Sequence, residues 1–157
     1  MIQHVAVEGS SWAEIPRRFE AGTPAIGEAI ALGTAIDYLT SLGMDNIKRY
    51  EEELFASAAE ILRNVEGLHL VGPVNNGGKQ SSILSFTLDG VHPHDLSTIL
   101  DSFGVQIRAG HHCAMPLLRR LGIQSTARAS IGVYSSIEDF QRLADGVREA
   151  RKIFGVN

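Results

Sequence analysis

The sequence predicts an α/β protein of the α+β-like type, in which helices cover a small mixed β-sheet. Three observations lead to this prediction. Two long segments in the first part of the chain carry apolar residues at helical spacing. After residue 67 the apolar residues switch to the alternation of strands, and strand and helix patterns then follow one another to the end. After a weak first strand, the expected order of elements is ααββαβαβα, which favours one sheet with helices packed on it.

The composition fits one globular core. The 157 residues are 44% hydrophobic and 20% charged, and 14 Lys and Arg stand against 18 Asp and Glu, a formal net charge of −4. An acidic excess provides no cationic face by default, so the composition excludes a basic nucleic-acid-binding module. Apolar runs end before the roughly 20 residues that a membrane span needs, and the N-terminus lacks a leader pattern. We therefore expect a soluble, cytoplasmic protein with no nucleic-acid or membrane partner.

The first part of the chain predicts two long helices. Thr23 and Pro24 are typical of a helix cap followed by proline in the first turn, and Asp45 is typical of a second cap after Gly43. The expected elements are a weak strand at 2–7, an irregular lead-in at 12–20, and helices at 24–42 and 45–64.

The remainder of the chain predicts a sheet whose strands are separated by helices. Asn-Asn-Gly-Gly at 75–78 predicts a flexible turn. There is no internal repeat and no low-complexity tract. The expected elements are strands at 68–71, 82–88, 105–108 and 127–133, and helices at 93–103, 116–120 and 137–154.

The segment at 108–116 carries the sharpest chemical signal. It reads Arg-Ala-Gly-His-His-Cys-Ala-Met-Pro, and its Cys113 is the single cysteine of the chain, so no internal disulfide can form. A thiol at the beginning of a helix feels the positive end of the helix dipole, and nearby Arg and His add positive potential. The thiolate is therefore favoured, and Cys113 is a candidate nucleophile. The alternative is a small buried hydrophobic cysteine, which polar, glycine-punctuated surroundings disfavour.

A metal site is a second interpretation of the same segment. Imidazole and thiolate groups suit zinc, and His92 and His94 could join His111, His112 and Cys113. Adjacent histidines seldom point at one ion, so we favour the reactive thiol and expect no metal.

Two arginines and one threonine are candidates for binding an anion. Arg128 interrupts an apolar strand pattern, where a guanidinium can hold a carboxylate through two hydrogen bonds or simply face water. Arg108 ends a predicted strand directly before the cysteine loop, which would bring both cations near Cys113. Gly22 and Thr23 precede a predicted helix, and they form either an ordinary cap or a cradle for phosphate or carboxylate.

Three segments, taken in order, resemble one family. They read Arg-Phe-Glu-Ala-Gly-Thr-Pro at 18–24, Arg-Ala-Gly-His-His-Cys-Ala-Met-Pro at 108–116, and Ala-Arg-Ala-Ser at 127–130 leading to Tyr134. The chain thereby resembles the C-terminal part of the class II cysteine desulfurases and selenocysteine lyases, which belong to the pyridoxal-phosphate-dependent class-V aminotransferases. The resemblance covers essentially the whole chain, with Ala109 where the family often has Thr.

The resemblance implies a fold and a reaction. Such enzymes are homodimers of the aspartate-aminotransferase fold type that use pyridoxal phosphate to convert L-cysteine, or selenocysteine, to L-alanine. The sulfur remains as a persulfide on a cysteine of the enzyme and passes to an acceptor protein, for iron–sulfur cluster assembly or other sulfur delivery. Residues 1–24 would lead out of a large cofactor domain, and residues 25–157 would form the small C-terminal domain.

The resemblance also implies a role for each candidate residue. These roles are the persulfide-forming nucleophile for Cys113, the clamp on the substrate carboxylate for Arg128, a supporting cation for Arg108, a contact to the partner's cofactor phosphate for Thr23, and shaping of the cysteine loop for His111 and His112.

The lysine that binds pyridoxal phosphate in this family has no counterpart in the sequence. None of Lys48, Lys79 and Lys152 lies in the family's lysine motif. We therefore expect this chain alone to bind no cofactor and to be inactive, and we expect an exposed apolar surface that promotes self-association. The alternative is a noncatalytic thiol-bearing binding or sulfur-carrier domain.

Overall fold

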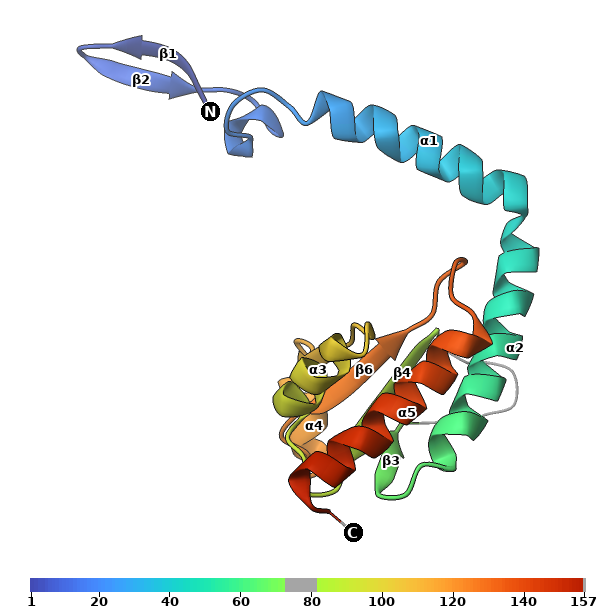
Figure 1. Ribbon diagram of the computed structural model, residues 1–157. Helices are drawn as coiled ribbons and strands as arrows, with labels where there is room; N and C mark the ends of the chain where they lie inside the picture. The colour runs from blue at the N-terminus through green and yellow to red at the C-terminus, as the bar shows by residue number, and fades with distance from the viewer. Residues whose placement is uncertain (73–81, 157) are drawn as a thin grey trace. The chain divides into compact units, whose positions relative to one another are not determined.

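The computed structural model describes residues 1–72 and 82–156 (Figure 1). The predicted turn at 75–78 lies outside the described residues. Contacts divide the chain into two units, Met1–Met44 and Asp45–Asn157. The sequence predicts a different boundary, between a segment at 1–24 that leads out of a large cofactor domain and a small domain at 25–157. That boundary stays a prediction.

The first unit contains a hairpin, a short 3-10 helix and one long α-helix. The elements are β1 (Ile2–Ala6), β2 (Gly9–Trp12), η1 (Arg17–Phe19) and α1 (Ile26–Leu42). The pairing of β1 with β2 is antiparallel. The sequence did not predict β2, because Gly-Ser-Ser lacks the apolar alternation of a strand, and pairing with β1 supplies its order instead. No residue of α1 is buried.

The prediction that Thr23 caps α1 is wrong. The N-cap is Ala25, which makes no side-chain cap hydrogen bond. Ala25 has φ of −72° and ψ of 70°, outside the helical region, so the helix begins after it, at Ile26.

The second unit is built on a four-stranded sheet. Its strands are β3 (Leu68–Val71), β4 (Ile83–Leu88), β5 (Arg108–Gly110) and β6 (Thr126–Ser130), in the spatial order β3-β4-β6-β5. The predicted α/β class is confirmed. All pairings among the described strands are antiparallel, whereas a mixed sheet was predicted. The strands β4 and β5 run in the same direction, but β6 lies between them, so no parallel pair forms.

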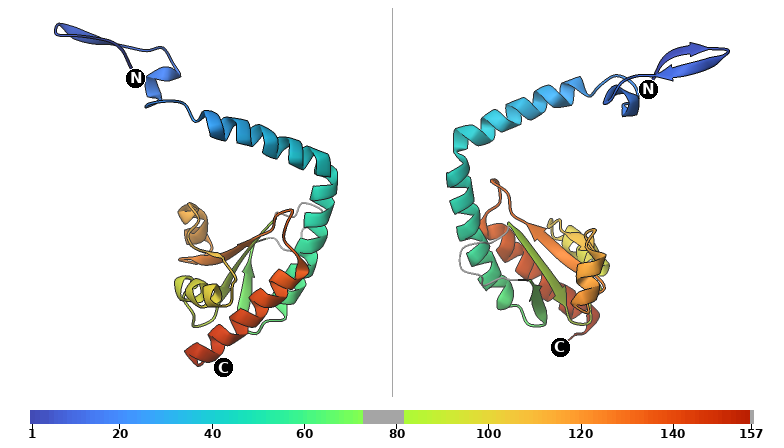
Figure 2. Two further views of the ribbon diagram at one scale, coloured as in Figure 1. Left: turned by 45° about the horizontal axis from the view of Figure 1, so that its top comes forward. Right: turned by 180° about the vertical axis from the view of Figure 1, so that it is seen from behind.

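The described helices of this unit are α2 (Met44–Arg63), α3 (Pro93–Ser102), α4 (Met115–Arg120) and α5 (Ile137–Phe154). Of these, α2, α3 and α5 contribute side chains to the core on one face of the sheet, whereas α4 contributes none. Alternate residues of β4, namely Leu84, Phe86 and Leu88, are buried in one core with side chains from α2, α3 and α5. The two views of Figure 2 show α5 lying against one face of the sheet. The opposite face carries Ser85, which lies directly across from Arg128 of β6. The face of the sheet opposite the core therefore carries a guanidinium.

The strand β5 begins later than predicted. The sequence predicts a strand at 105–108, whereas the ladder with β6 runs from Arg108 to Gly110. Val105 and Ile107 pack against the core from the irregular segment after α3, so their apolar character reflects burial and not strand pairing. Within the described residues, every helix is too short or too polar to cross a bilayer.

Candidate active site

The cysteine loop leaves the edge of the sheet through a tight, left-handed turn. Gly110 ends β5 with φ of 127°, and the next turn places His112 at φ of 53° and Cys113 at φ of 58°. Side-chain-bearing residues seldom occupy this region, and two in succession are rarer still. The Ala114 N–H closes the turn by donating to the His111 carbonyl at 2.8 Å. The result is an exposed thiol at Cys113, directly before the N-cap of α4.

His112 fastens this loop to the sheet. Its Nε2 lies 3.1 Å from the carbonyl oxygen of Thr126, to which it donates, and its Nδ1 is buried without a partner among the described residues. Burial lowers the pKa of His112, and the charges of Arg128, Arg108 and His111 lower it further, against the raising effect of the hydrogen bond to Thr126. His112 is therefore held as a neutral imidazole that donates from Nε2.

Two arginines face each other across the strand pair beside the loop. Arg108 of β5 lies directly opposite Arg128 of β6, so both side chains project from the same face of the sheet. Neither guanidinium forms an ion pair with an acidic side chain of the described residues. The Nε of Arg128 is buried and lacks a hydrogen-bond partner there. Like charges placed opposite each other repel, so this pair is suited to binding an anion between them.

Two cavities meet at Arg108. The first, of about 470 Å³, is lined by Cys113, His111, His112, His92, His94 and Arg108 among others. The second, of about 390 Å³, is lined by Arg108, Arg128, Arg142, Tyr134 and Asp139 among others. The structure thus brings Cys113, Arg108, Arg128 and both loop histidines into one continuous region of the second unit. The prediction that Arg108 ends its strand is wrong in detail, because Arg108 begins β5.

The zinc interpretation finds no support in the arrangement of the histidines. The rings of His92 and His94 stack, with centroids 5.5 Å apart and planes at 12°, so they do not converge on one point. No cluster of three His, Cys, Asp or Glu side chains with metal-binding geometry occurs within residues 1–72 and 82–156. Thr23 lies in the first unit, and its predicted contact to a cofactor phosphate stays a prediction.

Sequence reasoning missed Arg142 and Asp139 as lining residues. Asp139 accepts a hydrogen bond from the Ser136 N–H at 2.9 Å and so completes the capping box of α5. Arg142 lies three residues along α5, with Nη1 4.0 Å from Asp139. The helical pattern of 137–154 contains both residues. It does not predict that α5 borders the cavity, because that depends on the path of the loop that connects β6 to α5.

An antiparallel sheet, a left-handed cysteine loop and a cross-strand arginine pair define the candidate site. Residues 1–143 match the class-V aminotransferase family, and the chain belongs to that family. A probable cysteine desulfurase of Halalkalibacterium halodurans is 43% identical over 155 residues, which cover 99% of this chain and 37% of the relative. A probable cysteine desulfurase of Staphylococcus aureus is 42% identical over 154 residues, with coverage of 98% and 37%.

Solved structures of cysteine desulfurases confirm the fold. The apo cysteine desulfurase from Thermococcus onnurineus NA1 superposes with a TM-score of 0.77 at 40% identity, over 96% of this chain and 37% of that one. A cysteine desulfurase from Escherichia coli in its S-sulfonic acid form gives a TM-score of 0.76 at 30% identity, over 98% and 37%. The chain therefore spans 37% of the length of these relatives.

Proposed function

We propose that this chain is the cysteine-bearing part of a cysteine desulfurase. In this proposal Cys113 takes the sulfur of L-cysteine, or the selenium of selenocysteine, and L-alanine is released. The observation that carries the proposal is the exposed Cys113 beside a cavity that shares Arg108 with a second cavity, which Arg128 also lines. The names of the relatives support the same reaction.

In this proposal the two arginines bind the substrate and Cys113 is the nucleophile. Arg128 and Arg108 hold the substrate carboxylate through charge-assisted hydrogen bonds. The Cys113 thiolate then attacks the substrate sulfur, so that an S–S bond forms while the carbon–sulfur bond breaks. The electron pair of the broken bond stays with the substrate carbon, which takes up a proton and becomes L-alanine. His112 presents the thiol through its hydrogen bond to Thr126.

We also propose that the described residues alone make only an incomplete site for pyridoxal phosphate. When bound, this cofactor supplies the electron sink that stabilises the substrate carbanion. Lys48 and Lys152 are ion-paired to Glu52 and Glu149 with side chains 72% and 71% exposed, and neither lines the cavities beside Cys113. Lys79 lies outside the described residues. We therefore propose that the 157-residue chain alone binds no cofactor and does not turn over cysteine.

The proposal is tested with a chimera. The rest of the Halalkalibacterium relative, without the region that matches this chain, is fused to the N-terminus of the 157 residues. With pyridoxal phosphate and L-cysteine we expect alanine and a Cys113 persulfide, detected by mass spectrometry after thiol labelling. Arg128→Leu removes a charge-assisted hydrogen bond worth roughly 1.5–3 kcal/mol, which corresponds to a roughly 10- to 100-fold rise in KM.

Three further outcomes decide the proposal. Cys113→Ser should leave no persulfide on this part of the chimera. Alanine formation by the 157-residue chain alone would contradict the proposed inactivity. A chimera that binds cofactor but leaves Cys113 unmodified would contradict the desulfurase assignment.

The alternative is a sulfur-carrier domain that takes sulfur from another donor. The exposed thiol favours it, because no lysine of the described residues lines its cavity. A carrier would accept sulfur from inorganic polysulfide equally well in the wild type and in Arg128→Leu, and its chimera would form no alanine.

We propose the remaining properties from the family alone. The intact enzyme would be a cytoplasmic homodimer that passes sulfur from Cys113 to an acceptor protein, for iron–sulfur cluster assembly or other sulfur delivery. Thr23 would contact the cofactor phosphate bound by the partner subunit.

A further inference from the structure

Tyr134 is an exposed aromatic residue on a firmly held loop. It is 89% exposed and lies in the segment that connects β6 to α5, which projects past the end of the sheet (Figure 1). The buried Ser135 donates its N–H to the Gly132 carbonyl at 2.9 Å, and its Oγ accepts from the Gly132 N–H at 3.0 Å. The Tyr50 hydroxyl of α2 donates to the Ser135 carbonyl at 2.6 Å. Because loops held in place by a scaffold often carry binding residues, the exposed ring is a candidate for contact with a ligand.

The position of the Tyr134 ring depends on Gly132. A Cβ atom at residue 132 would lie 3.0 Å from Cζ and 3.3 Å from the hydroxyl oxygen of Tyr134. The phenol end of the ring therefore occupies the place toward which a side chain at residue 132 would point. Ala129 and Ile131 alternate into the core, so the residues between and after them project from the opposite face. That face carries Arg128, so the phenol end lies on the same face, beyond the end of β6.

Tyr134 borders the same cavity as the arginine pair. The cavity of about 390 Å³ is lined by Arg108, Arg128, Ser130 and Tyr134 among others. The Tyr134 hydroxyl forms no hydrogen bond with the described residues, and the buried Nε of Arg128 lacks a partner there. A guanidinium N–H can only donate, and a phenol O–H donates readily. The group that satisfies both is therefore an acceptor with several lone pairs, and the charge of the arginines selects an anion.

The chain's own carboxylate in this cavity is already engaged. Asp139 is the one acidic residue among the described lining residues. Its Oδ2 accepts from the Ser136 N–H at 2.9 Å, and its Oδ1 lies 4.0 Å from Nη1 of Arg142. These contacts hold Asp139 at the beginning of α5. We therefore expect the anion that Arg128 and Tyr134 bind to come from outside the chain.

We propose that Tyr134 is a further substrate-binding residue, whose hydroxyl donates a hydrogen bond to the carboxylate that Arg128 holds. The identification of this carboxylate with that of L-cysteine rests on the proposed function, whereas the binding of a carboxylate does not. A guanidinium fork uses one lone pair on each carboxylate oxygen, so each oxygen keeps a lone pair for a second donor. The phenol fills that position without adding charge. It thereby fixes the orientation of the molecule to which the carboxylate belongs.

Nuclear magnetic resonance of the full 157-residue chain tests the binding without cofactor. The chain contains three tyrosines, and the ring signal lost in Tyr134→Phe identifies the signal of Tyr134. The probe is S-methyl-L-cysteine, which has the carboxylate but no thiol. Its counterpart is 2-(methylthio)ethylamine, which lacks the carboxylate. We expect the Tyr134 signal to shift saturably with the first compound and not with the second, and Arg128→Leu should abolish the shift.

Two substitutions test the hydroxyl and its position separately. Dissociation constants are read from the backbone amide signal of Ser130, which every variant retains. Tyr134→Phe should raise Kd about 3- to 10-fold, because it removes one solvent-exposed hydrogen bond. Gly132→Ala keeps the hydroxyl but displaces the exposed ring, so it should raise Kd by a similar factor. The backbone of Gly132 lies outside the left-handed region and therefore accepts alanine.

Tyr38→Phe is the matched control. Tyr38 lies on α1 and is 59% exposed, so this variant should bind the probe as the wild type does. Unchanged melting temperatures show that each variant is folded. The proposal is wrong if Tyr134→Phe or Gly132→Ala keeps the wild-type Kd, or if Tyr38→Phe has an equal effect. The absence of a saturable shift in the wild type, or equal shifts with the two compounds, would also overturn it.

The kinetics of the chimera distinguish this proposal from the proposed function. Tyr134→Phe should raise KM for L-cysteine about 3- to 10-fold and leave kcat nearly unchanged, because the hydrogen bond is present in the ground state and the transition state alike. If the chimera forms alanine with a KM that Tyr134→Phe does not change, the proposal for Tyr134 alone is wrong. If the 157-residue chain binds the probe through Tyr134 but the chimera forms no alanine, the proposed function is wrong and the carboxylate site stands.

Discussion

Single residues in the cysteine loop combine a conformational cost with contacts that offset it. His112 and Cys113 both adopt left-handed backbone angles, at roughly 1–2 kcal/mol for each residue that bears a side chain. The hydrogen bond from Ala114 to His111 and the bond from the His112 imidazole to Thr126 hold this geometry. The imidazole of His112 is therefore a positioning group for the thiol.

Removing that imidazole should destabilise the second unit. His112→Leu leaves the Thr126 carbonyl without its partner, at a cost of about 1–3 kcal/mol in the free energy of unfolding. His112→Gln keeps an N–H donor at a similar distance from the backbone and should recover part of the loss. Urea unfolding near neutral pH measures both variants. Equal losses in the two variants would show that the hydrogen bond is not the stabilising contact.

The same residue should make stability depend on pH. The folded structure lowers the pKa of His112 below its ordinary value of 6.5, so the unfolded chain binds this proton more readily. The contribution of His112 to the free energy of unfolding is therefore fully present above pH 6.5. It is lost as the pH drops from 6.5 toward the pKa of His112 in the folded state. The wild type should lose more stability over this range than His112→Gln, which cannot titrate there. His4→Gln, an exposed control in the first unit, should follow the wild type.

Sequence motifs identified the chemical groups of the site, but they did not predict that the two arginines lie directly opposite each other on neighbouring strands. The residues Cys113, His111, His112, Arg108 and Arg128 stand out by type and spacing. The direct pairing of Arg108 with Arg128 depends on strand register. Register follows from which residues of each strand face the core, and three-residue β5 has too little apolar pattern to fix it.

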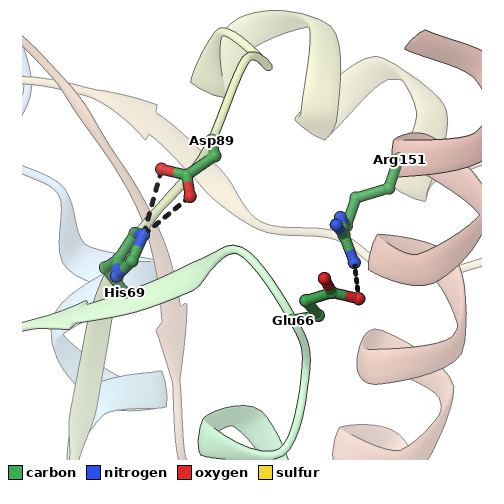
Figure 3. Close-up of polar contacts among 4 residues, drawn as sticks. All are labelled: Glu66, His69, Asp89 and Arg151. Atoms are coloured by element: carbon green, nitrogen blue, oxygen red, sulfur yellow. Dashed lines mark hydrogen bonds and ion pairs between the residues drawn. The ribbon is translucent and has the colours of Figure 1, made fainter. Parts of the chain in front are cut away.

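At the level of elements, one arginine joins the last helix to the turn between α2 and β3. Arg151 of α5 donates from Nη1 to Glu66 at 3.0 Å, and beside this pair His69 Nε2 lies 3.0 Å from both carboxylate oxygens of Asp89 (Figure 3). The Arg151 side chain is only 12% exposed, whereas that of Glu66 is 80% exposed. The two partners should therefore differ in their contribution to stability.

Truncating Arg151 should cost more than removing its partner. Arg151→Ala deletes a buried stem as well as a charge, and we expect a loss of about 1–2 kcal/mol in the free energy of unfolding. Glu66→Gln should change stability only slightly, because water already screens that exposed carboxylate. Urea unfolding of both variants tests the asymmetry.

Arg148 provides the matched control for this prediction. It lies one turn earlier on α5, with a side chain 47% exposed and paired to Asp145 of the same helix. Arg148→Ala should remain near the wild type. If it is as destabilising as Arg151→Ala, the loss comes from removing any arginine side chain of α5 and not from the buried stem of Arg151.

The boundaries of helices and strands could be predicted where the local signals of the sequence agree. The strand β3 at Leu68–Val71 and the helix α5 at Ile137–Phe154 lie where they were predicted, because apolar period and flanking turn residues agree. The strand β2 was missed because its order comes from its partner strand. The start of β5 was misplaced because burial of Val105 imitates a strand pattern.

For the whole molecule, the periodicity of the chain sufficed for the α/β class, and three short motifs sufficed for the family. The direction of strand pairing did not follow, because it depends on which strand lies between β4 and β5. The helix α1 also departs from the usual rule that one face of a helix is polar. Its apolar residues point in all directions, Glu28 and Asp37 are its only charged residues, and none of its residues is buried in the structure. Helices of this kind are normally covered on all sides by other protein.

The isolated chain should therefore self-associate through α1. Ile30 and Ile36 are 69% and 54% exposed, and burying such side chains against a second copy is favourable. Sedimentation of the wild type over a range of concentrations should show species larger than the monomer. The double variant Ile30→Glu with Ile36→Glu should shift the distribution toward the monomer, because association would bury unpaired carboxylates.

A second pair of exposed apolar residues distinguishes self-association through α1 from non-specific hydrophobic association. Val5 and Val7 lie in and after β1 and are 69% and 101% exposed, comparable to the two isoleucines. Exposed apolar side chains recur along α1 from Ile26 to Leu42, whereas Val5 pairs with Ser10 and Val7 precedes Glu8. We therefore expect Val5→Glu with Val7→Glu to leave self-association unchanged. If both double variants shift the protein equally toward the monomer, the added negative charge explains the dissociation and the position on α1 does not. If neither does, another surface holds the copies together, and α1 is not the contact.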